Sequence, residues 1–409
     1  MPKREPLFAW FHGIRVAELS SKRLGEVVCT YTPEALDTWP GNVPVLSCSL
    51  PLRARPFRAE NFFAGVLPEG QHRQAMAAEA GVAANDTYAL LARFGKDVAG
   101  AVVIAPEDPG ERPGTVVPYT GVQLEEEVAE LPNRPLGIHD DSELSIAGLQ
   151  DKLLLVALEN GGWGRPVHGY PSTHILKVED RRFPRMTEFE DACLRLARQV
   201  GLTTVETVIE HIAGVPCLIV SRFDRTKEAD GELVRIHQED ACQALDRDPQ
   251  AARGHGKYED SGGPALRELA GLLDRYAELP IEELVQLVRV VTFTVIIGNS
   301  DAHGKNLALV HPTPGRIRLA PLYDTVPTAM WSQLRSRAAM TVDRMQTMSQ
   351  ITLENIQAEA NAWRLDARRA LGAATSVVDE ILAAAETLPL PEEVEDHVVA
   401  RCKQLLGSK

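Results

Sequence analysis

Strand-like and helical patterns occupy different parts of this chain, and that order restricts its fold more than any other feature of the sequence. Short apolar runs bounded by turn residues predict strands up to residue 225 of the chain. They are LFAWF, RVAEL, GEVVCTYT and VPVLSCSLPL within the first 52 residues, AGAVVIAP at 99–106, and then LLLVALE, STHILKVE and VPCLIVSRFDR. Strands gathered in one half and helices in the other are typical of the α+β class.

Helical patterns dominate the rest of the chain. Residues 70–95 favour helix, and LEEEVAELP after them predicts an acidic, solvated helix. TEFEDACLRLARQVG (187–201) is amphipathic and ends in Gly201, a common helix terminator. In IEELVQLVRVVTFTVIIG (281–298), five apolar residues recur on one helical face: Leu284, Leu287, Val288, Val291 and Val295. The stretch after Ile351 is rich in Ala and predicts further helices, so a helical lobe follows a mixed one.

Two segments rich in glycine interrupt the strand-like part. EDPGERPGTVVP (107–118) predicts a linker or a long surface loop. Gly161, Gly162 and Gly164 lie between two predicted strands. Such a run can bind phosphate, but its place between strands favours a simple hairpin turn.

The composition narrows the functional classes. The chain has 409 residues, of which 44% are hydrophobic, enough for two or three packed units. The formal net charge of −14 argues against binding nucleic acid through the overall field. No two of the six cysteines form a Cys-x-x-Cys pair, so we expect neither a zinc cage nor a disulfide framework. Because the N-terminus lacks a signal-peptide core and no apolar run approaches the roughly 20 residues that span a bilayer, we expect a cytoplasmic protein without membrane contact.

A compact group of polar residues lies between two apolar runs in IIGNSDAHGKNLALV (296–310). Its Asp301 and Asn306 form the pattern Asp-x-x-x-x-Asn, the spacing of protein kinase catalytic loops. In those loops the Asp accepts the proton of the substrate hydroxyl, and the Asn holds a magnesium ion. Alone the match is weak, because a polar loop after a helix also uses Asn and His to bond free carbonyl groups.

Other kinase-like elements follow in the expected order. Asp324 ends the strand-like run RIRLAPLYD and corresponds to the second magnesium aspartate of kinases. Lys177 closes the strand HILKV, as the ATP lysine of kinases closes its own strand, and Glu188 or Glu190 of the next helix is the candidate for its ion pair. LIVSRFDR occupies the place of the hinge between two lobes. This shared order favours a kinase far more than the loop does alone.

One kinase element is missing, since no G-x-G-x-x-G precedes the lysine strand. SELSIAGLQDKLLLV stands in its place. Ser145, Gly148 and Lys152 offer a hydroxyl, a backbone N–H and an ammonium group that together are able to cradle phosphates. The alternative is an ordinary polar turn leading into a strand.

Together these segments resemble the HipA family of bacterial toxin kinases. The resemblance covers nearly the whole chain and is carried by SIAGLQDK, THILKV, SRFDR, RIHQEDACQAL, KYEDSGGP, IGNSDAHGKN and LAPLYD, with SCSLPL, NFFAGVLPEG and LLARFGKDVAGAVV in the N-terminal part. It implies an α+β, bilobal, protein-kinase-like fold with a β-rich N-terminal lobe, which includes a small N-terminal subdomain, and a mostly α-helical C-terminal lobe. The implied boundaries are 1–110 for the subdomain, 111–222 for the remainder of the N-terminal lobe with the phosphate loop and ATP lysine, and 223–409 for the helical lobe with the catalytic and metal-binding loops.

The resemblance also implies roles for single residues. Asp301 matches the catalytic aspartate, Glu190 the ion-pair glutamate, and Asn306 and Asp324 the magnesium ligands. Ser145 matches the serine that the family autophosphorylates. The implied ATP-binding residues are Ala147, Gly148, Leu149, Gln150, Asp151, Lys152, Lys177, Ser221, Arg222, Phe223, Asp224, His303, Lys305, Asn306 and Tyr323. Among them, Ser221 to Phe223 match the segment that meets adenine through its backbone, and Asp224 lies where the family contacts the ribose. Two residues depart from the family's phosphate loop. Leu149 stands where Ala is usual and adds bulk, and Asp151 replaces a common Glu, which shortens the acid without changing its charge.

By this resemblance the chain is an ATP- and Mg²⁺-dependent serine/threonine protein kinase and the toxin of a toxin–antitoxin pair. The implied partners are a HipB-like DNA-binding antitoxin, with operator DNA reached only through it, and a protein substrate such as an aminoacyl-tRNA synthetase. Two other functions stay open. One is a corepressor with a weak or silent site, and the other is a kinase of small molecules.

Overall fold

The computed structural model describes residues 4–111, 113–131, 151–229 and 231–407. Its N-terminal part is built on an antiparallel sheet of five strands in the order β4-β3-β2-β1-β5. The strands are β1 (Leu7–Phe11), β2 (Ile14–Ser20), β3 (Val28–Tyr31), β4 (Phe57–Arg58) and β5 (Val102–Ala105). Buried and half-buried residues alternate along β1, as expected of a strand with one face on a core. The predictions from LFAWF, RVAEL, GEVVCTYT and AGAVVIAP are confirmed.

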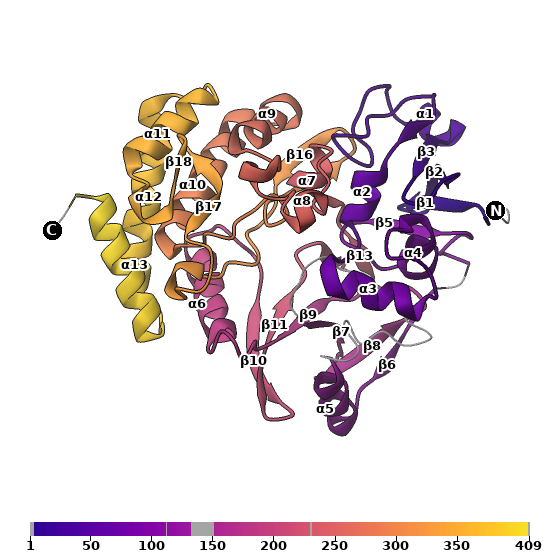
Figure 1. The fold of residues 1–409 in the computed structure, drawn as a ribbon, viewed down its shortest axis with the longest axis horizontal. Helices are drawn as coiled ribbons and strands as arrows, with labels where there is room; N and C mark the ends of the chain where they lie inside the picture. The colour runs from indigo at the N-terminus through magenta and orange to yellow at the C-terminus, as the bar shows by residue number, and fades with distance from the viewer. Residues whose placement is uncertain (1–3, 112, 132–150, 230, 408–409) are drawn as a thin grey trace.

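Four helices complete the N-terminal part. They are α1 (Pro33–Thr38), α2 (Glu60–Gly65), α3 (Gly70–Glu79) and α4 (Thr87–Phe94). Sheet and helices share one hydrophobic cluster, whose largest fully buried side chains include Phe62, Phe63 and Phe94. Figure 1 shows this part at one end of the molecule, with α2 and α3 turned toward the rest of the chain.

A second antiparallel sheet has six strands in the order β10-β11-β9-β7-β8-β6. The strands are β6 (Thr115–Pro118), β7 (Lys152–Ala157), β8 (Trp163–Val167), β9 (His174–Val178), β10 (Thr207–Ile212) and β11 (Val215–Ser221), with helices α5 (Gly121–Glu130) and α6 (Met186–Gln199) beside them. The segment predicted as a linker thus forms a strand at its end, because β6 pairs with β8. Gly161 and Gly162 have φ of 79° and 86° in the turn before β8, so the predicted hairpin turn is confirmed.

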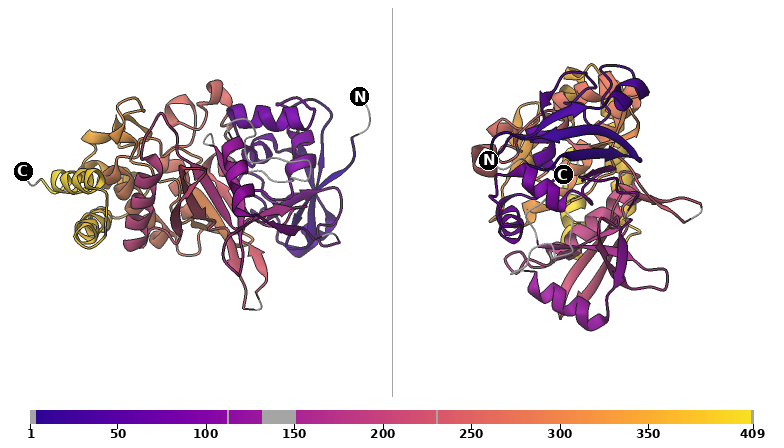
Figure 2. Two further views of the ribbon diagram at one scale, coloured as in Figure 1. Left: turned by 90° about the horizontal axis from the view of Figure 1, so that it is seen from below. Right: turned by 90° about the vertical axis from the view of Figure 1, so that its right-hand side faces the viewer.

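Helices prevail in the C-terminal part of the chain. The elements are β12 (Arg225–Lys227), β13 (Leu233–Arg235), β14 (Gln238–Asp240), α7 (Ala241–Ala244), α8 (Ala251–Gly254), η1 (Glu259–Ser261), α9 (Leu266–Tyr276), α10 (Pro280–Ile297), β15 (Ala308–Thr313), β16 (Arg316–Leu319), η2 (Thr328–Met330), β17 (Arg337–Val342), β18 (Met345–Thr347), η3 (Met348–Gln350), α11 (Leu353–Ala362), α12 (Ala367–Ala385) and α13 (Glu392–Leu405). Helix α10 lies at the centre of the largest hydrophobic cluster, against α9, α11, α12 and α13. Figure 2 shows the N-terminal sheet and the last helices at opposite ends of the long axis. The predicted α+β class is confirmed.

The end of α10 sets the position of the polar loop. Gly298 caps the helix with φ of 71°, a left-handed conformation that costs other residues about 1–2 kcal/mol. A Cβ atom there would meet Ala329 at 2.8 Å and His397 at 3.0 Å. The chain therefore turns sharply at Gly298 and leads directly into Asn299.

One predicted strand is wrong. VPVLSCSLPL, at residues 43–52, forms no strand, although Val45 and Leu46 are buried in the N-terminal core. Polar groups near its centre bond to the C-terminal part of the chain. The Cys48 N–H donates to Glu239 Oε1 at 2.9 Å, and the Ser49 hydroxyl donates to the Gln243 carbonyl at 2.7 Å. Apolar content alone does not distinguish such a loop from a strand.

Two further expectations concern covalent and membrane chemistry. All six cysteines lie in the described part of the chain, and each is free and buried, which agrees with the absence of a disulfide framework. Among the described residues, no helix combines the length and apolarity needed to cross a membrane.

Candidate active site

The loop after α10 folds back on itself. The Asp301 N–H donates to Asn299 Oδ1 at 3.1 Å, and Asn306 Nδ2 donates to the Asp301 carbonyl at 3.1 Å. The Ser300 N–H is bound by the Thr328 hydroxyl at 2.7 Å. These bonds tie the two ends of the predicted Asp-x-x-x-x-Asn motif together and leave Asn306 Oδ1 as the side-chain atom still available to a ligand.

Asp301 is the half-buried carboxylate of this loop. Its Oδ1 accepts a hydrogen bond of 2.6 Å from the Tyr258 hydroxyl. Burial raises the pKa of Asp301, against the opposing effects of the Tyr258 hydrogen bond and the Lys257 charge. A carboxyl group with a raised pKa is a better proton acceptor, which suits a general base.

His303 lies two residues further and is buried. Its ring packs edge-on against Tyr258, with centroids 5.3 Å apart. Burial and the nearby Lys257 charge lower the pKa of His303 well below its usual value, so the imidazole is neutral at neutral pH. Its Nδ1 atom has no hydrogen-bond partner among the residues that the structure describes.

Lys305 is fixed from three sides. Its ammonium group donates to Asp240 Oδ2 at 2.9 Å and to the Gly65 carbonyl at 3.0 Å, while its own carbonyl accepts from the Tyr323 hydroxyl at 2.6 Å. Because Gly65 belongs to α2, this lysine joins the loop to the N-terminal part. The pKa of Lys305 is raised, since Asp240 and Glu69 outweigh the effect of burial.

Lys177 lies between two carboxylates. Its ammonium group is 2.6 Å from Glu190 Oε1 of α6 and 2.6 Å from Asp324 Oδ1. The sequence left Glu188 and Glu190 as alternatives for this ion pair. The structure selects Glu190, because Glu188 pairs with Arg185 at 2.6 Å on the surface. Burial alone would lower the pKa of Lys177, but the two carboxylates raise it above its usual value.

Asp324 remains accessible although it is paired. Its side chain is 41% exposed. Partial burial would raise its pKa, but Lys177 holds it well below the usual range, so the group is a carboxylate at neutral pH. Its φ of 54° is left-handed, a conformation that Asp and Asn adopt more readily than most residues. With Asn306 Oδ1 it offers the oxygen ligands that Mg²⁺ prefers.

The two strand lysines are neighbours in the second sheet. Lys152 of β7 lies opposite Lys177 of β9 in the register. Burial and the Lys177 charge lower the pKa of Lys152 to about 8. This pair supplies positive charge beside Asp324, where an anionic ligand would be stabilised.

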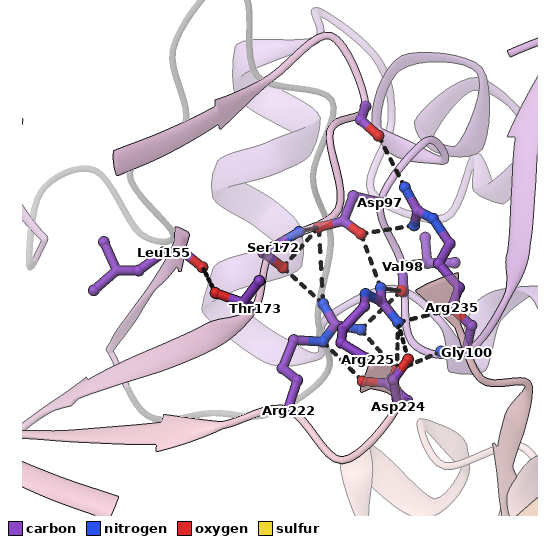
Figure 3. A network of polar contacts seen from close by, with 11 residues as sticks. Asp97, Val98, Gly100, Leu155, Ser172, Thr173, Arg222, Asp224, Arg225 and Arg235 are labelled. Atoms are coloured by element: carbon purple, nitrogen blue, oxygen red, sulfur yellow. Dashed lines mark hydrogen bonds and ion pairs between the residues drawn. The ribbon is translucent and has the colours of Figure 1, made fainter. Parts of the chain in front are cut away.

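Ser221 to Asp224 follow β11, where a network of buried charges joins three parts of the chain (Figure 3). Asp224 accepts bonds of 2.9 and 2.8 Å from Arg222 and one of 2.7 Å from the Gly100 N–H. Arg222 also donates to the Ser172 hydroxyl at 2.8 Å. The side chains of Arg222 and Asp224 are therefore engaged within the protein.

The aromatic rings of Phe223 and Tyr323 pack together beside the segment that follows β11. Their ring centroids are 5.3 Å apart and their planes are tilted by 31°. Tyr323 directly precedes Asp324, so this pair connects the predicted adenine segment with the predicted metal aspartate. Both residues were among the sequence predictions.

Part of the predicted phosphate loop lies outside the described residues. This holds for Ser145, Ala147, Gly148, Leu149 and Gln150. Asp151 is described, and its Oδ1 lies 3.1 Å from His72 Nε2 of α3. The N-terminal part therefore touches the end of this segment.

Sequence reasoning gave no role to three residues that the structure brings to the site. Tyr258 contacts Asp301, Lys257 lies beside it, and Glu69 reaches both Lys257 and Lys305 at 3.4 and 3.8 Å. The signal was present, because KYEDSGGP and NFFAGVLPEG contain these residues. Nothing local in either segment indicates that it meets the loop at 299–306.

An α+β fold that brings a lysine, its helix glutamate and an exposed aspartate beside an Asp-x-x-x-x-Asn loop defines the chain as a protein-kinase-like phosphotransferase. The model of the HipA-like C-terminal domain matches residues 144–386, and that of the HipA N-terminal domain matches residues 7–105. The chain therefore belongs to the HipA family. This confirms the resemblance seen in the sequence and the expectation of a serine/threonine protein kinase.

Two curated relatives agree with this assignment. Y4mE of Sinorhizobium fredii, described as a candidate kinase, is 35% identical over 377 residues, which are 89% of this chain and 85% of the relative. The serine/threonine-protein kinase toxin HipA of Shewanella oneidensis is 28% identical over 374 residues, which are 85% of this chain and 83% of the relative.

A solved structure has the same fold. The match is to the complex of HipA, HipB and operator DNA from Shewanella oneidensis, with a TM-score of 0.81, 24% identity and 98% of both chains covered. At this identity the match supports the fold alone. The roles of individual residues have to be argued from the geometry of the site in this chain.

Proposed function

We propose that the chain is an ATP- and magnesium-dependent serine/threonine protein kinase that acts as the toxin of a HipA/HipB-type toxin–antitoxin pair. The observation that carries this proposal is the position of Lys177, held 2.6 Å from both Glu190 and Asp324. Active protein kinases require an ion pair between a strand lysine and a helix glutamate, and an aspartate that holds magnesium. Lys177, Glu190 and Asp324 match these three groups.

The chain's own residues act mainly by positioning and by charge. Asp301 orients the acceptor hydroxyl and takes its proton, with Tyr258 holding one carboxylate oxygen. Asn306 and Asp324 would hold a magnesium ion, which would neutralise phosphate charge. Lys177 would contact the phosphates, and its ion pairs with Glu190 and Asp324 support this role by holding its ammonium group in place.

The nucleotide would lie between the two lysine strands and the segment after β11. Lys152, with Ala147 to Asp151, would contact the phosphates, and the backbone of Ser221 to Phe223 would contact adenine. His303, Lys305 and Tyr323 would line the same site. The Asp224 carboxylate is engaged by Arg222 and Gly100, so its proposed contact with the ribose requires those bonds to rearrange.

Ser145 is the proposed site of autophosphorylation. A phosphate there would add about −1.5 to −2 charges, which Lys152 and Lys177 would attract. That charge would draw the loop away from the geometry that cradles ATP, so the modified enzyme would bind nucleotide poorly.

The toxin role rests on family membership and on the Shewanella oneidensis relative, which is named a kinase toxin and has been solved with HipB and operator DNA. The proposed partner is a HipB-like DNA-binding antitoxin. The proposed substrate is a translation component such as an aminoacyl-tRNA synthetase.

The test is incubation of purified protein with labelled Mg²⁺-ATP and a bacterial lysate, with Asp301→Asn as the matched control. We expect labelled protein bands, one phosphate on the peptide that contains SIAGLQ, and neither signal in the control. The control should still bind ATP, because Asp301 is assigned to the acceptor hydroxyl. No label at all would support the corepressor alternative, and label only in small molecules would support the small-molecule kinase. Near wild-type transfer by Asp301→Asn would remove that residue from the base role.

A further inference from the structure

Lys257 is a buried lysine beside the catalytic loop to which no role has been given. It is 5% exposed and directly precedes Tyr258. Its carbonyl accepts a hydrogen bond of 3.1 Å from the Gly304 N–H, so its backbone is fastened to the loop between Asp301 and Asn306. The position of Lys257 is therefore tied to that of the catalytic residues.

The Lys257 ammonium group is weakly held. It lies 3.4 Å from Glu69 Oε2, and in the described part of the chain it has no second acceptor. A buried ammonium group needs strong partners to offset the loss of water. Lys305, which is equally buried, has such partners in Asp240 and Gly65. Of the two lysines near the loop, Lys257 is thus the one that can accept an anionic ligand without breaking a strong ion pair.

The surroundings of Lys257 point to the same conclusion. Its Nζ atom is 5.8 Å from the centroid of the Tyr258 ring, whose hydroxyl contacts Asp301. His303, packed on that ring, has a buried Nδ1 atom with no partner among the described residues. Glu69 Oε1 is also buried and accepts no hydrogen bond from the described residues, although Lys305 lies 3.8 Å away. Polar groups left unsatisfied around one carboxylate are a common mark of a site that a ligand completes.

We infer that Lys257 is a further catalytic residue whose ammonium group contacts the phosphoryl group during its transfer, and that Glu69 is the positioning residue that holds this lysine. The inference rests on the proposed phosphoryl transfer at Asp301. In that step the acceptor oxygen bonds to the γ-phosphorus, the bond from the γ-phosphorus to the β,γ-bridging oxygen breaks, and its electron pair leaves with ADP. The hydroxyl proton goes to the Asp301 carboxylate. Lys257 exchanges no proton and stabilises the negative charge on the transferring group.

The other three lysines are less suited to this task. Lys177 is paired with Glu190 and Asp324 and is already assigned to the phosphates of the bound nucleotide, and Lys305 is paired with Asp240. Lys152 stands at the end of the phosphate loop, opposite Lys177 in the sheet. Among the lysines that the structure describes near the site, Lys257 is therefore the one beside Asp301, where the acceptor hydroxyl would bind.

If Glu69 positions Lys257, the N-terminal part of the chain contributes a residue to the active site. Glu69 immediately precedes α3 and is 4% exposed. Its carboxylate lies 3.4 Å from Lys257 and 3.8 Å from Lys305. The N-terminal part therefore helps to set the positions of both lysines.

The experiment compares Lys257→Met, Lys257→Arg, Glu69→Gln and the double variant of Lys257→Met with Glu69→Gln. Lys227→Met, at an exposed residue of β12, is the matched control. We expect Lys257→Met to lower kcat about 10²–10³-fold, the usual effect of removing one donor to a developing charge. The Kd for a fluorescent ATP analogue should change less than about threefold, because the contact strengthens only during transfer. Lys257→Arg should recover part of the activity.

Glu69→Gln should lower kcat by about tenfold on its own and should have a clearly smaller effect in the Lys257→Met background, because Lys257 is the nearer of the two lysines that Glu69 contacts. Near wild-type kcat in Lys257→Met would overturn the inference, as would a loss of ATP-analogue affinity equal to the loss in kcat. Additive effects in the double variant would overturn the role of Glu69. If Lys257→Met does not fold, Lys257→Arg and Glu69→Gln still test the inference through kcat. If Lys257→Met has normal kcat and Asp301→Asn is inactive, only the role of Lys257 is refuted. If Asp301→Asn is active, the proposed function itself is refuted.

Discussion

Asp324 combines exposure with a strong ion pair, and this makes its removal informative. Asp324→Asn keeps a residue that tolerates the φ of 54°, but removes the charge that we propose binds metal. We expect weaker Mg²⁺-ATP binding and a higher Mg²⁺ requirement, measured as kcat against Mg²⁺ concentration. Asp324→Ala should be worse, since Ala fits the left-handed backbone less well. Unchanged Mg²⁺ dependence in both variants would contradict the assignment.

Tyr258 holds Asp301 through a single hydroxyl, so Tyr258→Phe is a clean change. The ring would keep its contacts with His303 and with the Arg335 guanidinium, which lies 4.6 Å from its centroid. Without the bond of 2.6 Å, the Asp301 carboxylate loses one fixed oxygen. We expect kcat to fall about tenfold with little change in KM for ATP, since misplacing a catalytic group affects transfer more than binding. An equal rise in KM would indicate a role in nucleotide binding instead.

The charge network of Figure 3 joins the turn after α4 to the segments around β12 and β13. Asp97 is its centre, 2.9 Å from Arg225 and 2.7 Å from Arg235, and it is fully buried. Asp97→Asn would leave buried arginines without a counter-charge. We expect a loss of about 3–5 kcal/mol in the free energy of unfolding, measured by urea denaturation, with the exposed Asp37→Asn as control. A loss no greater than that of the control would show that the arginines find other partners.

The same residue predicts a pH dependence. Burial would raise the pKa of Asp97, but Arg235 and Arg225 hold it below the usual value. The carboxylate therefore stabilises the fold above the unfolded pKa of about 3.9, and this contribution is lost as the pH falls through the lower folded pKa. The wild type should lose stability on acidification through this range. Asp97→Asn should lack that part of the pH dependence.

Local patterns account for what the sequence predicted, and distant contacts for what it missed. Helix α10 and strand β9 follow from periodicity within a few residues, and Asp301, Asn306 and Lys177 follow from spacing within those elements. By contrast, residues 43–52 failed to form a strand because Glu239 and Gln243 bind them from almost two hundred residues away. Lys257 and Glu69 were missed for the same reason. The subdomain boundaries at 110 and 222 stay predictions.

At the level of the cell, growth arrest should depend on phosphoryl transfer. The N-terminal and C-terminal parts meet at the active site through Lys305, Gly65 and Glu69, so the complete chain is the unit to express. We expect induced expression to arrest growth and co-expression of a HipB-like partner to relieve the arrest. The Asp301→Asn variant, expressed to the same level, should not arrest growth. Arrest that persists in that variant would point to a binding mechanism.

The charge of the whole chain makes a separate prediction about DNA. With a formal net charge of −14 and a pI near 5.3, the chain repels the phosphate backbone, and attraction to phosphates supplies most non-specific affinity. We therefore expect that this chain alone does not shift operator DNA in a gel. The test uses a low salt concentration of about 50 mM, at which electrostatic binding to DNA is strong. A slower-migrating complex should form when a basic HipB-like antitoxin is added, and its affinity should fall steeply with salt. Binding of DNA by the chain alone, with a steep dependence on salt, would reveal a local basic surface that the net charge conceals.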